Sequence, residues 1–194
     1  MDRNDLAWEE VKTEHIVQDE WIDFRRSAYR FPDGTVFEPY YSYSKRDYVV
    51  VVALDEEGRY ICVRQYRQGI KEVTTEFPAG GLDFEDGKKH GPKDEEKALK
   101  DAKRELLEET GYVSEEWTHL LTIPSNATIS DNYAYLYCAR NCRRVDEQHL
   151  DDTEFLNVEL HTREEMEALI KCGKFQQVDH VAAWYISIAG QHSM

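Results

Sequence analysis

Short apolar runs separated by turn residues fill most of the first half of the chain, a pattern typical of β-strands. The clearest run is Tyr48 to Leu54, where apolar and mostly β-branched residues follow one another without a break, as in a strand buried on both faces. The polar turn Asp55-Glu56-Glu57-Gly58 then leads into residues 59–66, its predicted partner strand. A weaker strand pattern over residues 72–77 ends in Pro78-Ala79-Gly80-Gly81, whose glycines let the backbone approach another group closely.

The pattern changes to a helical one over residues 94–110, which are mostly strong helix formers. Asp94 is a good N-cap residue, and Gly111 is the expected stop. Apolar positions recur at helical spacing at Leu99, Ala102 and Leu106. Further strands are predicted over residues 117–123, 133–139 and 155–160, and closing helices over 162–172 and 178–189.

The N-terminal segment has strand patterns of its own between Ile16 and Tyr43, around the turn signal Phe31-Pro32-Asp33-Gly34. We interpret it as an antiparallel β-hairpin arm. The predicted fold class is therefore α+β, with an arm over residues 1–45 and a domain with a mixed sheet and helices over residues 46–194.

The net charge of the chain limits the classes of molecule that it is expected to bind. The chain has 24 Lys and Arg against 39 Asp and Glu, a formal net charge of −15, which disfavours binding to nucleic acid or to anionic membranes. A phosphate-bearing substrate would need divalent cations and a few well-placed arginines. The sequence has no apolar stretch near the ~18 residues of a membrane span and starts without a signal-peptide pattern. We expect a cytoplasmic protein that acts on small molecules.

Three carboxylates of the predicted helix are candidate metal ligands. Glu105 and Glu109 are i, i+4 neighbours, and Glu108 lies beside Glu109. Either solvent screens them or a divalent cation binds among them, and in so acidic a chain the spacing alone does not decide. Arg104 is placed to orient a carboxylate through its bidentate guanidinium.

The string Arg104-Glu105-Leu106-Leu107-Glu108-Glu109-Thr110-Gly111, with Glu96 eight residues before it, resembles the Nudix box. That pattern is Gly, five residues, Glu, seven residues, then Arg-Glu-aliphatic-any-Glu-Glu-any-Gly-aliphatic. The final position is Tyr112 here. The first half departs from the pattern, because Gly81 lies about fifteen residues before Glu96. An insertion through residues 86–92 accounts for the difference, and insertions in exposed loops cost little.

The resemblance implies a Nudix α/β/α sandwich that binds Mg²⁺, with Mn²⁺ as a substitute. Its expected ligands are the carboxylates of Glu105, Glu108, Glu109 and Glu96 and the carbonyl of Ala79. The implied reaction is attack of water on one phosphorus of a pyrophosphate. Glu154, with Asp152 second, is the candidate general base, although their acidic loop could also be a solvated turn.

Within that family, Arg64-Gln65-Tyr66-Arg67 and Glu76-Phe77-Pro78-Ala79-Gly80 resemble the ADP-ribose and nucleoside-diphosphate-sugar pyrophosphatases. Arg64 and Arg67 are thus candidates to bind the diphosphate. The arm resembles the hairpin that those homodimers exchange, with Trp21 and Phe37 as candidates to stack on a base or, alternatively, to fill the hairpin core. The loop Ser125-Asn126-Ala127-Thr128 either contacts a sugar or is a plain turn.

The predicted function is Mg²⁺-dependent hydrolysis of ADP-ribose or a related nucleoside diphosphate sugar, which releases a nucleoside monophosphate and a sugar phosphate. Two alternatives remain. One is a house-cleaning pyrophosphatase for nucleoside triphosphates, and the other is a Nudix-like module that binds a nucleotide metabolite without cleaving it.

Overall fold

The computed structural model describes residues 5–83 and 94–190, which divide into two units. The arm unit consists of residues 5–46 and 124–133, and the core unit of residues 47–83, 94–123 and 134–190. The insertion proposed within the box, residues 86–92, lies outside the described residues.

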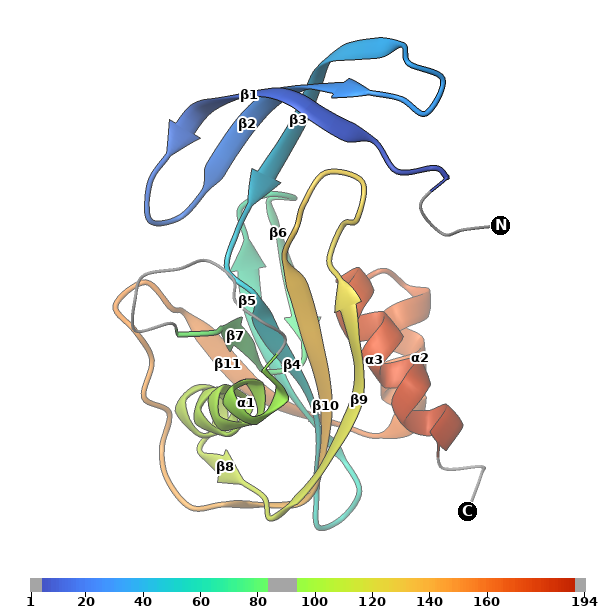
Figure 1. Ribbon diagram of the computed structural model, residues 1–194. Coiled ribbons are helices and arrows are strands. Elements are labelled where there is room, and N and C mark those ends of the chain that lie inside the picture. Colours follow the sequence, from blue (N-terminus) through green and yellow to red (C-terminus); the bar gives the residue numbers. More distant parts are fainter. Residues whose placement is uncertain (1–4, 84–93, 191–194) are drawn as a thin grey trace. The chain divides into compact units, whose positions relative to one another are not determined.

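The core unit is built on a mixed sheet of eight strands (Figure 1). Its central order is β11-β5-β4-β10-β8, with β6 on β5, β7 on β4 and β9 on β10. β4 and β10 are parallel, whereas the other pairings with described register are antiparallel. The strands are β4 (Tyr48–Asp55), β5 (Tyr60–Arg67), β6 (Glu72–Glu76), β7 (Ala79–Gly81), β8 (Tyr112–Val113), β9 (Glu116–Pro124), β10 (Tyr133–Arg144) and β11 (Leu156–His161).

Helices cover both faces of this sheet. α1 (Glu95–Thr110) lies on one face, and α2 (Arg163–Lys171) and α3 (Val178–Ala189) lie on the other (Figure 1). α1 and α3 both pack on β4, which explains why seven of its eight residues are buried. The predicted α+β class with an α/β/α sandwich is confirmed.

Local capping signals fix the ends of the helices. The Asp94 side chain accepts a hydrogen bond from the Lys97 amide at the start of α1. Gly111 ends that helix in the left-handed region, at φ 76°, and its N–H donates to the Leu107 carbonyl. Thr162 and Glu165 form the capping box of α2.

The buried face of α1 is not purely apolar. Ala102 and Leu106 of the predicted apolar stripe are buried and Leu99 is half-buried, and Glu105 and Glu109 are only 7% and 3% exposed. Polar residues therefore complete the buried face. The buried face consists of Ala98, Asp101, Ala102, Glu105, Leu106, Glu109 and Thr110. Two carboxylates of the box thus point toward the protein and away from solvent.

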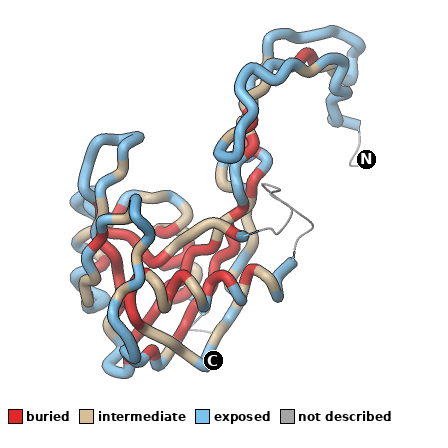
Figure 2. Tube along the Cα trace, turned by 90° about the vertical axis from the view of Figure 1, so that its left-hand side faces the viewer, coloured by how far each residue is buried: buried red, intermediate tan, exposed pale blue. Residues whose placement is uncertain are grey.

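The arm unit is a three-stranded antiparallel sheet of β1 (Glu9–Gln18), β2 (Asp23–Arg30) and β3 (Val36–Ser44). β2 and β3 form the predicted hairpin, whose turn is closed by a 2.8 Å hydrogen bond from the Phe31 N–H to the Thr35 carbonyl. Most of the arm is exposed (Figure 2). Its exposed large hydrophobic residues are Leu6, Trp8, Val11, Ile16, Val17, Trp21, Val36, Phe37 and Tyr41.

Residues 124–133 belong to the arm unit although they connect β9 to β10. The Tyr43 N–H donates to the Ile129 carbonyl, and the Tyr40 hydroxyl donates to the Thr128 carbonyl. Asp131 accepts hydrogen bonds from Arg25 at 3.0 Å and from Ser44 at 2.6 Å. The loop considered for sugar binding therefore has extensive contacts with the arm. None of the helices formed by the described residues is long and apolar enough to cross a membrane.

Candidate functional site

The short segment Ala79–Gly81 of β7 faces two carboxylates of α1. The Ala79 N–H donates to Glu109 Oε2 at 3.0 Å. Gly80 packs so closely on Glu105 that an added Cβ would lie 2.0 Å from Cδ and from Oε1 of that side chain. Any residue other than glycine at this position would displace the Glu105 carboxylate. The segment thus fixes the positions of Glu105 and Glu109 from the sheet side.

Arg104 links the remaining carboxylate to this pair. Its guanidinium donates to Glu105 Oε1 at 2.8 Å and to Glu108 Oε2 at 2.7 Å. A third hydrogen bond, 3.3 Å long, reaches the Gly81 carbonyl. Arg104 therefore orients the carboxylates of Glu105 and Glu108 by charge-assisted hydrogen bonds.

Burial makes the ionised state of these carboxylates unfavourable. It raises the pKa of Glu105 to about 7, against the opposing charge of Arg104. It also raises the pKa of Glu109 well above its usual range, and the neighbouring Glu105 adds to this effect. Buried, mutually repelling carboxylates of this kind are stabilised when a cation binds between them.

Glu154 lies close enough for its charge to act on the same pair, because it contributes to the raised pKa of both Glu105 and Glu109. The loop that precedes Glu154 is attached to the C-terminal end of α1, because the His149 N–H donates to the Glu108 carbonyl at 2.8 Å. Glu154 is half-buried, whereas Asp152 is exposed. Burial and charge thus favour Glu154 over Asp152 as the acidic group of this loop near Glu105 and Glu109.

The donor set suits a hard divalent cation, because it consists of carboxylate oxygens beside a backbone turn. Among residues 5–83 and 94–190, no three His, Cys, Asp or Glu side chains are already arranged to hold a metal ion. Arg104 pairs with Glu105 and Glu108 in this arrangement. Glu96 is exposed in the first turn of α1, roughly 13 Å along the helix from Glu105 at 1.5 Å per residue. The structure does not bring Glu96 to the other carboxylates.

The two candidate arginines of β5 have different surroundings. Arg67 forms a bidentate pair with Glu76, which is fully buried, at 2.9 Å and 2.5 Å. The charge of Glu109 also acts on Arg67. Arg64 lies 3.8 Å from Glu159 on β11 and lines a separate pocket with Leu169 of α2. Residues three apart on a strand point to opposite faces, so one diphosphate is not expected to contact both arginines.

Trp21 and Phe37 lie at opposite ends of the arm sheet. Trp21 precedes Asp23, which pairs with Ser44, whereas Phe37 pairs with Tyr29. At about 3.3 Å per residue, roughly 20 Å of strand separates the two ends. Trp21 and Phe37 are 68% and 46% exposed, and the Phe37 ring packs against the rings of Phe31 and Tyr40 within the arm. One chain alone does not bring them to the same base.

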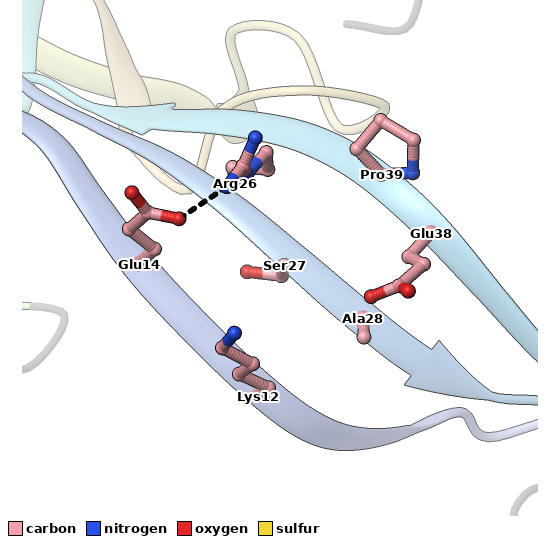
Figure 3. A pocket seen from close by; sticks show the side chains of 7 residues that line it. All are labelled: Lys12, Glu14, Arg26, Ser27, Ala28, Glu38 and Pro39. Carbon is pink, nitrogen blue, oxygen red and sulfur yellow. Dashed lines mark hydrogen bonds and ion pairs between the residues drawn. The ribbon is translucent and has the colours of Figure 1, made fainter.

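The arm unit has a pocket of about 380 Å³, and none of the predicted site residues lines it (Figure 3). Its charges balance, since Lys12 and Arg26 line it together with Glu14 and Glu38, and Arg26 donates to Glu14 at 2.5 Å (Figure 3). The pocket is lined by Lys12, Glu14, Arg26, Ser27, Ala28, Glu38 and Pro39. It has no feature that selects a phosphorylated ligand.

Comparison with known proteins decides the family. Residues 44–183 match the NUDIX domain. The chain belongs to the Nudix family. The Nudix match spans the whole carboxylate site, from β7 through α1 to Glu154, and members of this family use divalent cations. Family membership and the enzyme class, a Nudix pyrophosphohydrolase, were both predicted and are confirmed.

Two related proteins match most of the chain. It is 28% identical over 168 residues to an ADP-ribose pyrophosphatase of Bacillus subtilis (strain 168), a match that covers 83% of this chain and 82% of the relative. It is 26% identical over 186 residues to a methanol dehydrogenase activator of Bacillus methanolicus, with 92% and 91% covered. A crystal structure of an ADP compounds hydrolase superimposes with a TM-score of 0.79 at 18% identity, covers 97% of both chains and shows the shared fold.

Sequence reasoning missed two buried polar residues beside the Nudix site. Glu76 holds Arg67, and although burial opposes its ionisation, the hydrogen bonds from Arg67 keep the pKa of Glu76 below its usual range. His180 of α3 accepts a hydrogen bond from the Phe77 N–H. Glu76 directly precedes Phe77-Pro78-Ala79-Gly80, and this position next to the glycine turn could have marked it as a residue near the site. No local signal marks His180, because its partner lies 103 residues away.

Proposed function

We propose that the chain hydrolyses the pyrophosphate bond of ADP-ribose or a related nucleoside diphosphate sugar with Mg²⁺, or Mn²⁺ in its place. The observation that carries the proposal is the pair of buried carboxylates, Glu105 and Glu109, held against Ala79–Gly80. The similarity to an ADP-ribose pyrophosphatase over most of both chains supports this substrate class.

Glu105, Glu108 and Glu109 would hold the cation, with the Ala79 carbonyl as a further ligand. When bound, the cation polarises the phosphoryl oxygens and lowers the pKa of water. Arg104 keeps the carboxylates of Glu105 and Glu108 in position through its hydrogen bonds to them, and the Ala79 N–H holds that of Glu109. Burial of Glu105 and Glu109 strengthens their interaction with a cation, because water screens it less.

Glu154 is the proposed general base. It takes a proton from the water that attacks phosphorus, and the bond from that phosphorus to the bridging oxygen breaks. The products are a nucleoside monophosphate and a sugar phosphate. Arg67 is the proposed diphosphate contact, because Glu76 already holds its guanidinium in one orientation and Glu109 lies within electrostatic range. The position of Arg64 beside Glu159 favours it less.

The arm is proposed to serve association and recognition of the base. Its exposed large hydrophobic residues are typical of a surface that a second copy of the chain covers. Trp21 and Phe37 lie too far apart in one chain to sandwich one base, so a sandwich would combine Trp21 of one copy with Phe37 of the other. Dimerisation through the arm would bring these two side chains together.

A substrate panel tests the proposal. Purified protein with Mg²⁺ should release a monophosphate from ADP-ribose or another nucleoside diphosphate sugar, and Glu108→Gln should abolish most of the turnover. Faster cleavage of nucleoside triphosphates would favour the house-cleaning alternative. Release of no monophosphate from the whole panel, by the unaltered protein and by Glu108→Gln alike, would refute the proposal.

The relative described as a methanol dehydrogenase activator favours one second candidate, a module that binds a nucleotide metabolite without cleaving it. Calorimetry separates the two functions. Tight binding of ADP-ribose without cations and without turnover would support the binding module.

A further inference from the structure

The segment that positions Glu105 and Glu109 has an anchor on the opposite side of the sheet from α1. β6 pairs with β5 as far as Glu76, where the ladder ends. The next residue, Phe77, is fully buried, so its N–H requires another acceptor. Nδ1 of His180 provides it at 3.1 Å. Pro78 follows and has no N–H to donate.

His180 is suited to this role because it is held in one state. Its side chain is 4% exposed, and burial lowers its pKa to about 4, so the ring is neutral near pH 7. Since Nδ1 accepts from Phe77, the proton of the neutral ring is on Nε2. The ring lies parallel to the Phe77 ring, at an interplanar angle of 5°, and contacts Phe175 edge-on.

The contact leads directly to the carboxylates. Two residues after Phe77, the Ala79 N–H donates to Glu109, and Gly80 touches Glu105. Within this segment the Pro78 carbonyl accepts from the Val51 N–H at 2.9 Å, and β7 pairs with β4. These other anchors are made by backbone groups of β4. His180 is the side chain of α3 that holds the start of the segment.

We propose that His180 is a positioning residue for the divalent-cation site, acting through the Phe77 amide on the Phe77–Gly80 segment. The inference rests on the function proposed above. His180 does not touch the cation or the substrate, and its effect passes through the backbone that orients Glu109 and confines Glu105. Loss of the acceptor leaves the buried Phe77 N–H unpaired, and the segment shifts to relieve it.

The test compares two substitutions at one position. His180→Phe keeps a ring of similar size without an acceptor, whereas His180→Asn places an amide oxygen near the position of Nδ1. Met166→Ala, at a fully buried position of α2, controls for a general loss of stability. Hydrogen exchange of the Phe77 amide in cation-free protein and the Kd for Mn²⁺, from electron paramagnetic resonance of free Mn²⁺, are measured for all four proteins.

We expect His180→Phe to raise the Kd for Mn²⁺ about tenfold, as substitutions behind metal ligands do, and to speed Phe77 exchange. His180→Asn should restore both values to within about threefold of the unaltered protein, and Met166→Ala should leave the Kd unchanged. Equal Mn²⁺ affinity in His180→Phe and the unaltered protein would overturn the positioning role alone. If the unaltered protein bound no Mn²⁺, the proposed cation site would fail, and the inference would fail with it.

Discussion

β4 of the core unit and β1 of the arm unit are strands of similar length with opposite environments. Seven of eight residues of β4 are buried, whereas β1 has nine exposed residues and one half-buried residue among ten. β4 is covered by helices on both faces and supports the carboxylate site through β7. The arm sheet leaves several large hydrophobic side chains exposed, among them Val11, Val36 and Phe37. The carboxylate site thus lies within the core unit of one chain, whereas the exposed arm carries the proposed contact with another copy.

The largest expected effect is on the core unit. Glu109→Gln should lower kcat by at least about 100-fold, because a cation that stabilises the transition-state charge contributes several kcal/mol. The measurement is the rate of monophosphate release at saturating substrate and Mg²⁺. Glu96→Gln is the matched control, since Glu96 is on the same helix but exposed, and its rate should stay near that of the unaltered protein. Equal losses in both variants would contradict the separation of Glu96 from the site.

Removal of the arm should change assembly. Deletion of residues 1–44 should convert dimers to monomers and raise KM, because Trp21 and Phe37 are lost together. Light scattering gives the mass, and steady-state kinetics gives KM. A truncated protein that remained dimeric would place the interface on the core unit and contradict the role of the arm.

A single substitution separates base recognition from assembly. Trp21→Ala should raise KM by about 5- to 150-fold, in line with about 1–3 kcal/mol for stacking on one base. Trp21→Phe keeps an aromatic face and should recover most of the affinity. Both variants should stay dimeric by light scattering. An unchanged KM in Trp21→Ala would show that the exposed indole does not bind the base.

The smallest effect is a dependence of core stability on pH. Burial lowers the pKa of His180 in the folded protein to about 4, below its ordinary value of 6.5. At this group the unfolded chain binds more protons between these values, so the contribution of His180 to stability falls as the pH decreases, by up to about 1.4 kcal/mol per unit. The raised pKa values of Glu105 and Glu109 act in the opposite direction, because the folded protein binds more protons at these two groups. Urea unfolding of cation-free protein at pH 7 and pH 5, compared between the unaltered protein and His180→Phe, isolates the contribution of His180. From pH 7 to pH 5, His180→Phe should lose less stability, or gain more, than the unaltered protein, and the substitution His149→Gln, at an exposed histidine, should change as the unaltered protein does.

Local features of the fold were predictable from the sequence. The β-branched run of β4, the Asp94 cap and Gly111 stop of α1, and the capping box of α2 all depend on neighbouring residues. The opposite directions of Arg64 and Arg67 also followed from the period of a strand, although the sequence interpretation assigned both to the diphosphate.

The remaining features depend on contacts between distant segments. The burial of Glu105 and Glu109 follows from the approach of Ala79 and Gly80, which the helical spacing of Leu99, Ala102 and Leu106 does not reveal. β1 lacks a buried face, so it lacks the alternation that predicts a strand. The attachment of residues 124–133 to the arm rests on hydrogen bonds to Tyr40, Tyr43 and Arg25.

The most direct test of the account is the cation dependence of the reaction. ADP-ribose is incubated with chelator-treated protein while Mg²⁺ is added stepwise, and AMP and ribose 5-phosphate are quantified. We expect no AMP without Mg²⁺, a saturable rise in AMP as Mg²⁺ is added, and loss of that rise in Glu109→Gln. AMP formation at the same rate without divalent cations, or in Glu109→Gln, would contradict the role assigned to the carboxylates of α1.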